Sequence, residues 1–259
     1  MSELPVRWSE AAASRSAGRR PEVAALPAGP HPDVATLFTF MRDAELRFRT
    51  LAMRIEERTW GSEGESLRIH EILVRHPDLS RVTVRYAERE MPQDYDVWAC
   101  DGSRVRTYSA VHRVRTDRPV RRPLVGLESS TLPATSKVYS PAIRLPADSM
   151  AEVFIHPGNF LQNVLSTGPV QVRGRIQVAG REAVEVASLH PRTTRYVADR
   201  PDHVVVVAAD AALGVLSLLE ERLGDRVVRR AEATSIDPDG SIPDSAFAIA
   251  VPADAQRVY

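Results

Sequence analysis

Three apolar segments in the last quarter of the chain constrain its fold more than any other feature. They are His203–Asp210, Val215–Leu223 and Arg226–Ile236. An Ala-Ala-Leu-Gly turn follows the first segment, and a Gly-Asp turn follows the second. Apolar, β-branched runs of this length, separated by turns of a few residues, are typical of consecutive hairpins. The sequence therefore predicts an antiparallel meander near the C-terminal end.

The apolar residues nearer the N-terminus change their period once. From Asp33 to Arg49 they recur mostly every three or four residues, and Asp33 stands where an N-cap belongs. From Leu51 to Ile55 every second residue is a large apolar one, which is the period of a strand. We therefore expect an amphipathic helix that leads directly into the first strand.

The middle of the chain adds further strands and one long connection. Asp101-Gly102 is the strongest two-residue hairpin signal in the sequence. Between Arg115 and Ser149, repeated X-Pro pairs make the chain too proline-rich for a central strand or a regular helix. The other expected elements are strands at Leu67–Arg75, Arg81–Ala87, Asp94–Cys100, Arg104–Val114, Val170–Val178 and Arg181–Leu189, and a short helix at Asn159–Leu165. In all, about nine to eleven antiparallel strands predict a single, highly curved sheet.

The composition fits one domain and excludes several kinds of protein. With 259 residues, 43% of them hydrophobic, the chain can bury a sizeable core. Lys+Arg and Asp+Glu both number 34, so no net charge attracts nucleic acid. Cys100 is the only cysteine, and no histidine spacing matches a zinc site, so we expect no disulfide, metal or other cofactor. Lys137 is the only lysine, and this preference for arginine predicts a GC-rich, actinobacterial genome.

Residues 1–32 contain no apolar stretch long enough for a signal peptide and no cysteine for lipidation. We therefore expect a flexible N-terminal arm, a cytoplasmic protein and no stable insertion into a membrane. Residues 33–259 are expected to form one domain. Its proline- and arginine-rich part, at about 115–149, is interpreted as an insertion.

The C-terminal meander resembles that of the bacterial lipoprotein-carrier superfamily. Its members include LolA, LolB, the mycobacterial lipoproteins LppX and LprG, and the sensor domain of RseB. The matching positions are Asp210, Gly214, Gly224-Asp225, Phe247 and Pro252, all of them turn or packing positions. The resemblance implies an α+β fold that is mainly β: an open half-barrel whose helices plug the concave face. Relatives of this type are exported, so a cytoplasmic location would be a departure from the family.

The resemblance also implies that the concave face binds a hydrophobic ligand, such as a lipid, an acyl chain or a lipophilic metabolite. The two plugs would be the helix at Asp33–Arg49 and the segment Met150–Leu165. The side chains expected to line the face and its plugs are Phe38, Met41, Met53, Ile55, Ile69, Val82, Val84, Tyr86, Trp98, Tyr108, Phe160, Leu161 and Val164.

Alternating arginines suggest a second kind of contact. Arg104, Arg106 and Arg113 are candidates to bind a lipid headgroup or a protein partner. A solvated strand face is the simpler interpretation of the same pattern. The resemblance to RseB implies an alternative function, a regulatory domain that binds a sigma or anti-sigma factor.

An enzyme is the third class of function to consider. A pocket recruited for cyclisation or isomerisation would use Asp94, Asp96, Tyr108 or His112 as its acid and base. No sequence motif supports such chemistry. We therefore expect a non-catalytic binding protein.

Overall fold

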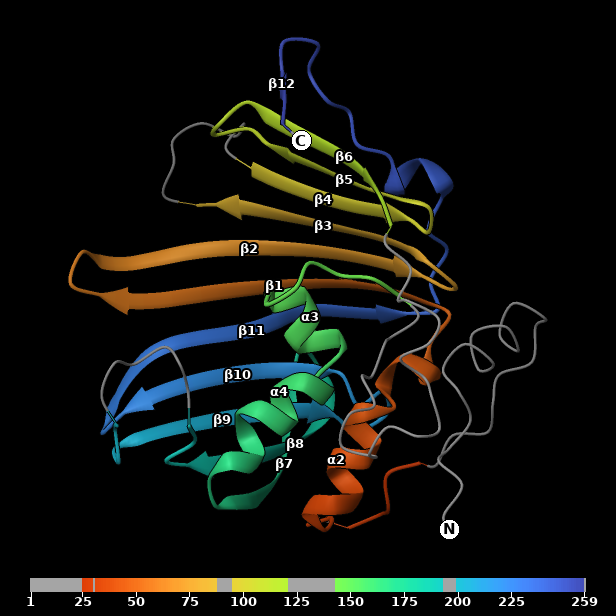
Figure 1. Cartoon of the computed structure of the whole chain (residues 1–259). Coiled ribbons are helices and arrows are strands. Elements are labelled where there is room, and N and C mark those ends of the chain that lie inside the picture. Colours follow the sequence, from red (N-terminus) through yellow and green to blue (C-terminus); the bar gives the residue numbers. More distant parts are fainter. Residues whose placement is uncertain (1–24, 30, 88–94, 121–142, 193–198, 259) are drawn as a thin grey trace, which may run out of the picture.

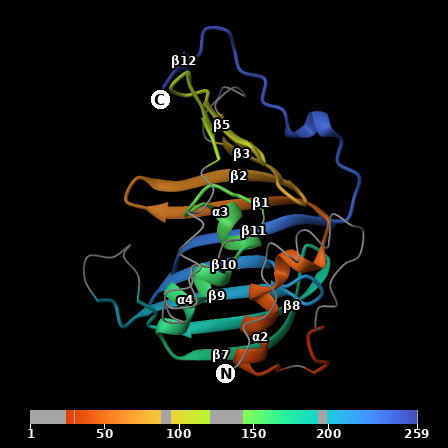
Figure 2. The same cartoon turned by 45° about the vertical axis from the view of Figure 1, so that its right-hand side comes forward.

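One sheet of twelve strands forms the framework of the computed structural model, which describes residues 25–29, 31–87, 95–120, 143–192 and 199–258 (Figure 1). The strand order is β12-β6-β5-β4-β3-β2-β1-β11-β10-β9-β8-β7. The two edge strands, β12 and β7, do not pair with each other, so the curved sheet stays open (Figure 2). The predicted open, mainly antiparallel half-barrel is confirmed. The strands are β1 (Thr50–Gly61), β2 (Gly64–Arg75), β3 (Leu79–Tyr86), β4 (Tyr95–Asp101), β5 (Arg104–Ser109), β6 (Val114–Pro119), β7 (Val170–Val178), β8 (Arg181–Leu189), β9 (His203–Asp210), β10 (Leu216–Leu223), β11 (Arg226–Pro238) and β12 (Gln256–Arg257).

Three helices lie against one face of this sheet, which we call the helix-covered face (Figures 1 and 2). They are α2 (Val34–Arg42), α3 (Met150–Ile155) and α4 (Gly158–Asn163). Asp33 caps α2 as predicted, because its Oδ1 accepts a hydrogen bond of 2.9 Å from the Thr36 N–H. A short 3-10 helix, η3 (Leu165–Thr167), follows α4.

The N-terminal helix is shorter than predicted. α2 ends at Arg42 rather than near Arg49, and a separate 3-10 turn, η1 (Ala44–Arg47), leads to β1. Glu45 in this turn is fully buried among polar partners. Because Glu45 places a carboxylate on the buried face of η1, this turn does not continue the apolar stripe of α2.

β1 lies at the centre of the sheet, where it pairs with β2 on one side and with β11 on the other. Its residues alternate between buried and partly exposed, with Leu51, Met53 and Ile55 on the helix-covered face. The predicted period of two is confirmed. The first and last long strands of the chain are therefore neighbours, and their pairing ties the two halves of the sheet together.

The start of the proline-rich insertion is a strand, which corrects the prediction. The segment expected as one strand, Arg104–Val114, divides into β5 and β6 at a turn where Arg113 has a φ of 51°. β6 uses residues up to Pro119, and the Thr107 and Thr116 hydroxyls, 2.7 Å apart, pair it with β5. Proline is tolerated here because Pro119 lies at the end of the strand. Residues 121–142 of the insertion lie outside the described part of the chain.

After β11, residues 239–258 form a strap that crosses the opposite face of the sheet. Arg75 Nη1 donates to the Ile242 carbonyl at 2.9 Å, and Arg81 Nη1 donates to the Ala246 carbonyl at 3.0 Å. Phe247, in the 3-10 turn η4 (Asp244–Phe247), lies under the Arg75 guanidinium. The strap ends as β12, which pairs with β6 in parallel, so the expectation of a wholly antiparallel sheet was wrong at this edge.

The turn between β9 and β10 shows why Asp210 and Gly214 occupy their positions. The Asp210 carboxylate accepts hydrogen bonds from the backbone N–H groups of Ala212 and Leu213, and it pairs with Arg181. Gly214 has a φ of 79°, and a Cβ there would lie 2.7 Å from the Phe40 carbonyl oxygen. These residues form a turn that α2 packs against, which fits the structural role predicted for them.

The segment just before α2 contacts the other edge of the sheet. Arg175 on β7 donates from Nε to the Gly29 carbonyl at 2.7 Å and from Nη2 to the Pro27 carbonyl at 3.2 Å. Leu26 packs against the main core. Of the arm predicted at 1–32, residues 25–29 are therefore packed on the domain, and residues 1–24 lie outside the described part.

Candidate ligand-binding face

The helix-covered face presents a continuous apolar surface across most of the sheet. In the middle of the sheet it is made by Leu51, Met53 and Ile55 on β1 and by Ile72 and Val74 on β2. The surface continues over the neighbouring strands through Val82, Val184, Val186, Val205, Val207, Ala209, Leu216, Leu219, Ala231, Ala233 and Ile236. All of these side chains belong to one buried cluster with the helices.

The helices that cover this surface are short. α3 has six residues and is capped by Ser149, whose hydroxyl accepts a hydrogen bond from the Glu152 N–H. Its Phe154 and Ile155 are fully buried, and Met150 is 5% exposed. An isolated helix of this length is unstable in water, so α3 is held by its apolar contacts with the sheet and not by its own hydrogen bonds.

Most of the predicted lining residues come together on this face. Met41, Met53, Ile55, Val82 and Leu161 are buried in the cluster. Phe38, Val84, Trp98, Phe160 and Val164 are partly buried and pack against it. These ten side chains therefore share one apolar region, as the sequence predicts.

The register of the strands places two predicted lining residues elsewhere. Ile69 is one residue from His70 and three from Ile72, which both lie on the helix-covered face, so Ile69 lies on the opposite face. Tyr108 pairs with Val97 on the face that the strap crosses. Tyr86 is on the helix-covered face, where its hydroxyl donates to Asp96 Oδ2 at 2.9 Å. A shift of one residue moves a side chain to the other face, and the imperfect alternation of β2 hid this shift.

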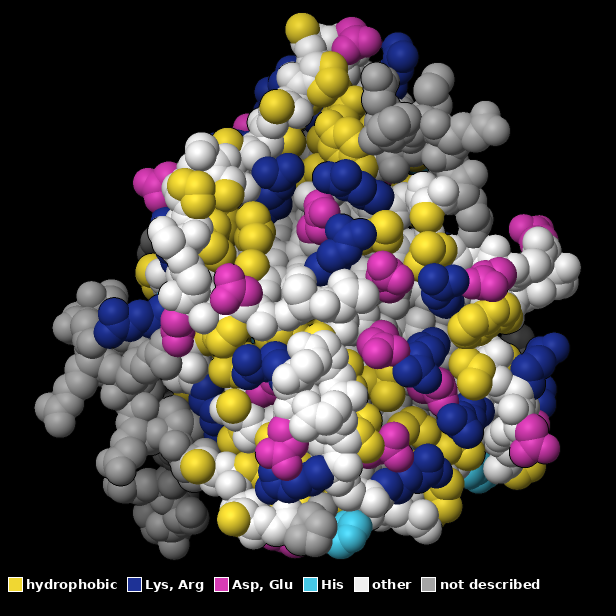
Figure 3. All heavy atoms as spheres, turned by 180° about the vertical axis from the view of Figure 1, so that it is seen from behind, with side chains coloured by type: hydrophobic (Ala, Val, Ile, Leu, Met, Phe, Trp, Pro, Cys, Tyr) yellow, Lys and Arg dark blue, Asp and Glu magenta, His cyan; other side chains and the backbone are white. Residues whose placement is uncertain are grey.

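The three candidate arginines also lie away from the apolar surface. Arg104 pairs with Asp117 at 2.7 Å, and Arg106 pairs with Asp101 at 3.1 Å, both on the opposite face. Arg113 pairs with Asp254 of the strap at 3.5 Å. Basic and acidic side chains are interspersed over that face (Figure 3). These arginines therefore stabilise the strands and the strap, and they form no cationic patch among the described residues.

The residues considered for acid–base chemistry do not meet. Asp96 lies on the helix-covered face and Tyr108 lies on the opposite one. His112 is exposed in the β5–β6 turn, and Asp94 lies outside the described residues. The three described members of this set, Asp96, Tyr108 and His112, form no acid–base pair.

A line of ionisable side chains, which we call the polar row, crosses the helix-covered face. Its members come from five neighbouring strands: His70 (β2), Glu57 (β1), Arg229 (β11), Glu221 (β10) and His203 (β9). His70 Nε2 lies 2.9 Å from Glu57 Oε2, and Arg229 donates to Glu57 Oε1 from Nε at 2.8 Å. Arg229 Nη1 donates to Glu221 Oε1 at 3.1 Å, and His203 Nε2 lies 3.8 Å from Glu221 Oε2.

The polar row is almost entirely buried. The exposed fraction is 18% for the Arg229 side chain and below 10% for the other four. Burial raises the pKa of Glu57, but the His70 hydrogen bond and the Arg229 charge outweigh it and lower that pKa to about 2. Glu57 is therefore charged at neutral pH. The sequence carried a signal for it, because Glu57 continues the buried alternation of Leu51, Met53 and Ile55.

A second buried polar group lies at the other end of α3. Glu45 Oε1 accepts a hydrogen bond from the Ile143 N–H at 2.8 Å. Glu45 Oε2 lies 3.4 Å from His156 Nε2, and Oε1 lies 3.7 Å from His76 Nδ1. Burial raises the pKa of Glu45, but the two histidines and the Ile143 N–H outweigh it, so the pKa lies below its ordinary value. This group joins η1, the β2–β3 turn and the end of α3.

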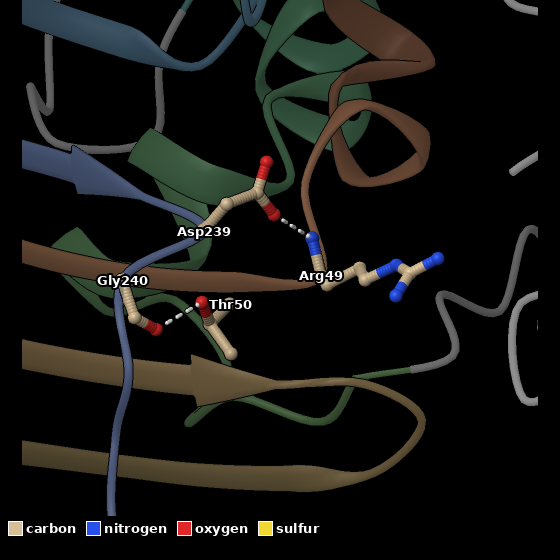
Figure 4. Close-up of a pocket in the computed structure, with 4 residues that line it drawn as sticks. All are labelled: Arg49, Thr50, Asp239 and Gly240. Atoms are coloured by element: carbon tan, nitrogen blue, oxygen red, sulfur yellow. Dashed lines mark hydrogen bonds between the residues drawn. The ribbon is translucent and has the colours of Figure 1, made fainter. Parts of the chain in front are cut away.

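Two shallow hollows on the described surface lie outside the apolar face. One, of about 460 Å³, is lined by Arg49, Thr50, Asp239 and Gly240 (Figure 4). Asp239 accepts a hydrogen bond from the Arg49 backbone N–H, and the Gly240 carbonyl accepts one from the Thr50 hydroxyl. These groups fasten the end of β11 to the start of β1, so we assign them a structural role.

Two further properties concern only the residues that the structure describes. None of their helices is long and apolar enough to cross a membrane. Their His, Cys, Asp and Glu side chains include no group of three or more that is arranged to hold a metal ion. Cys100 is buried, and burial raises the pKa of its thiol.

Neither a family model nor a curated protein sequence matches the chain. Similar solved structures include MucB in its complex with MucA from Pseudomonas aeruginosa, with 13% identity and a TM-score of 0.45 over 83% of this chain and 60% of that one. LppX from Mycobacterium tuberculosis has 10% identity and a TM-score of 0.37 over 78% of this chain and 94% of that one. A LolA superfamily protein from Nitrosomonas europaea has 10% identity and a TM-score of 0.33 over 86% of this chain and 99% of that one. A protein of the superfamily that the sequence resembles is among these similar structures, and all three TM-scores are below 0.5.

Proposed function

We propose that this protein binds a long acyl chain, or a lipophilic molecule of similar length, against the helix-covered face. The observation that carries the proposal is the apolar surface that runs from β3 through β1 to β8 under helices of only six to nine residues. In the structure the side chains of α3 are buried against the middle of this surface, between β2 and β10. A ligand therefore binds by taking the place of α3.

The free-energy cost of displacing α3 and the free energy gained by burying the acyl chain of the ligand are of similar size. Displacing α3 exposes Met150, Phe154 and Ile155. At about 1.5–3 kcal/mol for each large apolar side chain, this costs about 5–9 kcal/mol. A ligand gains about 0.8 kcal/mol for each methylene it buries, so about 6–11 methylenes offset the cost. Only ligands with longer chains bind with net favourable free energy.

A series of ligands of increasing length tests this proposal. We expect neutral esters with chains of about eight carbons to bind weakly and those of about 16 carbons to bind tightly, because each added methylene contributes about 0.8 kcal/mol. Isothermal titration calorimetry or competition with a fluorescent apolar probe measures the dissociation constants of the full chain. The buried apolar area also predicts a negative heat-capacity change that grows with chain length.

Two outcomes would contradict the proposal. One is an affinity that does not change with chain length. The other is failure of every member of the series to bind, which would favour the regulatory function, in which the protein binds a protein partner instead of a lipid.

A further inference from the structure

The polar row points to the chemistry of the ligand's other end. We infer that the ligand has an uncharged hydrogen-bond acceptor next to its acyl chain, such as an ester or hydroxyl group, and that Arg229 donates to this acceptor. The inference rests on the proposed function, because it places the polar end of the same ligand. It goes further by naming the class of ligand: neutral amphiphiles rather than free fatty acids.

The position of the row fits the end of a ligand that replaces α3. Along β1, the apolar positions of the helix-covered face end at Ile55, and the next residue on that face is Glu57. Arg229 Nη2 lies 3.6 Å from the sulfur of Met150, the first residue of α3. A chain that lies where α3 lies therefore reaches Arg229 at the start of the helix, and its polar end meets the row there.

Arg229 keeps hydrogen-bonding capacity for such a group. A guanidinium has five N–H donors. In the described part of the chain, Nε donates to Glu57, Nη2 forms an ion pair with the same carboxylate oxygen at 2.7 Å, Nη1 donates to Glu221, and Nη2 also contacts the Met150 sulfur. A thioether is a weak acceptor. Displacement of Met150 releases that Nη2 donor, and the second N–H of Nη1 has no partner among the described residues. Two donors are then available to one carbonyl or hydroxyl oxygen.

The charges of the row select against an anionic end group. Among the described residues, two carboxylates, Glu57 and Glu221, already surround the single guanidinium of the row. Arg68 on β2 is the cross-strand neighbour of Glu57 and lies on the same face of the sheet. Its side chain is exposed to solvent, and its guanidinium lies over the Tyr86 ring. An added carboxylate would share Arg229 with two others in a buried site, whereas a neutral acceptor gains the hydrogen bonds without this repulsion.

Matched ligands with the same 16-carbon chain test the inference on the full protein. The pair to compare is the glycerol monoester and the free fatty acid, measured at pH 8, where histidine is ordinarily uncharged and carboxylic acids are ionised. We expect the ester to bind at least tenfold more tightly. Equal affinity, or tighter binding of the acid, would overturn the inference and leave the proposed function standing. If neither binds, the proposed function itself fails.

A pair of variants locates the effect at the row. Glu221→Gln removes one carboxylate charge beside Arg229. We expect this variant to lower the ratio of the dissociation constant of the acid to that of the ester by at least threefold. Glu71→Gln is the matched control, because Glu71 on β2 pairs with Arg54 and Arg85 on the opposite face. Thermal unfolding shows whether each variant is folded. An unchanged ratio in folded Glu221→Gln would contradict the assignment to the row, and if this variant does not fold, the comparison of ligands on the natural chain decides the question.

Discussion

Glu57 makes the stability of this protein depend on pH. Burial raises the pKa of its carboxylate, but the hydrogen bond with His70 and the charge and hydrogen bond of Arg229 outweigh burial and lower the pKa from 4.5 to about 2 in the folded protein. A carboxyl with a lowered folded pKa stabilises the protein fully above its unfolded pKa. That stabilisation is lost as the pH falls towards the folded pKa. Glu45, whose pKa is also lowered, acts in the same direction.

Comparison of the natural chain with Glu57→Gln measures this contribution. We expect the difference in unfolding free energy to reach about 3 kcal/mol at pH 7, since each pKa unit corresponds to 1.36 kcal/mol, and to disappear between about pH 4.5 and pH 2. Urea denaturation at a series of pH values gives the unfolding free energy of the natural chain and of the variant as a function of pH. Glu65→Gln is the control, because Glu65 pairs with Arg58 at the surface, and this substitution should lower the unfolding free energy only slightly. A difference that stayed constant down to pH 2 would show that Glu57 is not held in the charged form.

Among the elements, α3 is the helix that the proposed ligand displaces. It joins the two buried polar groups, since Met150 at its start contacts Arg229 and His156 at its end lies beside Glu45. Between them, Phe154 inserts fully into the core. A change at Phe154 should therefore affect stability and ligand affinity in opposite directions.

The variant Phe154→Ala tests this coupling. We expect it to lower the unfolding free energy by about 3–5 kcal/mol, as other buried Phe→Ala changes do. Because less apolar area is then lost when α3 is displaced, the affinity for a 16-carbon ester should rise about tenfold. Phe247→Ala is the matched control, since Phe247 belongs to the strap and is buried against the opposite face of the sheet. It should lower stability and leave affinity unchanged; a loss of affinity in Phe154→Ala alone would indicate that α3 forms part of the binding site instead of covering it.

The elements also show what the sequence could predict. The alternation of β1, the Asp101-Gly102 hairpin and the three-strand meander depend on neighbouring residues, and all were predicted correctly. β6 forms a hairpin with the neighbouring β5 and was missed because the X-Pro pairs after Arg115 argued against a strand, whereas its pairing with β12 depends on residues far apart in the chain. The same limit hid the polar row, whose five members come together only when β1 pairs with β11.

On the scale of the whole molecule, the sheet has two differently covered faces. The helices cover the apolar face over β1, β2 and β7–β11, and the C-terminal strap crosses the other face near β2–β5 (Figure 1). The sequence predicted the sheet and the plugs but assigned Ile69 and Tyr108 to the wrong face, because the imperfect alternation of apolar residues does not fix the register of these strands. Ligand binding is proposed only for the face under α3.

Photo-crosslinking tests the central claim most directly. A 16-carbon glycerol ester with a diazirine in the chain is bound to the full protein, irradiated, and located by peptide mass spectrometry. We predict labels on residues under α3, such as Met53 on β1, Ile72 on β2 and Leu219 on β10, and none on Val97 or Tyr108 of the opposite face. Competition by unlabelled ester should remove the labels. Labels confined to the strap and the opposite face, or labels that the unlabelled ester does not reduce, would contradict binding at the helix-covered face.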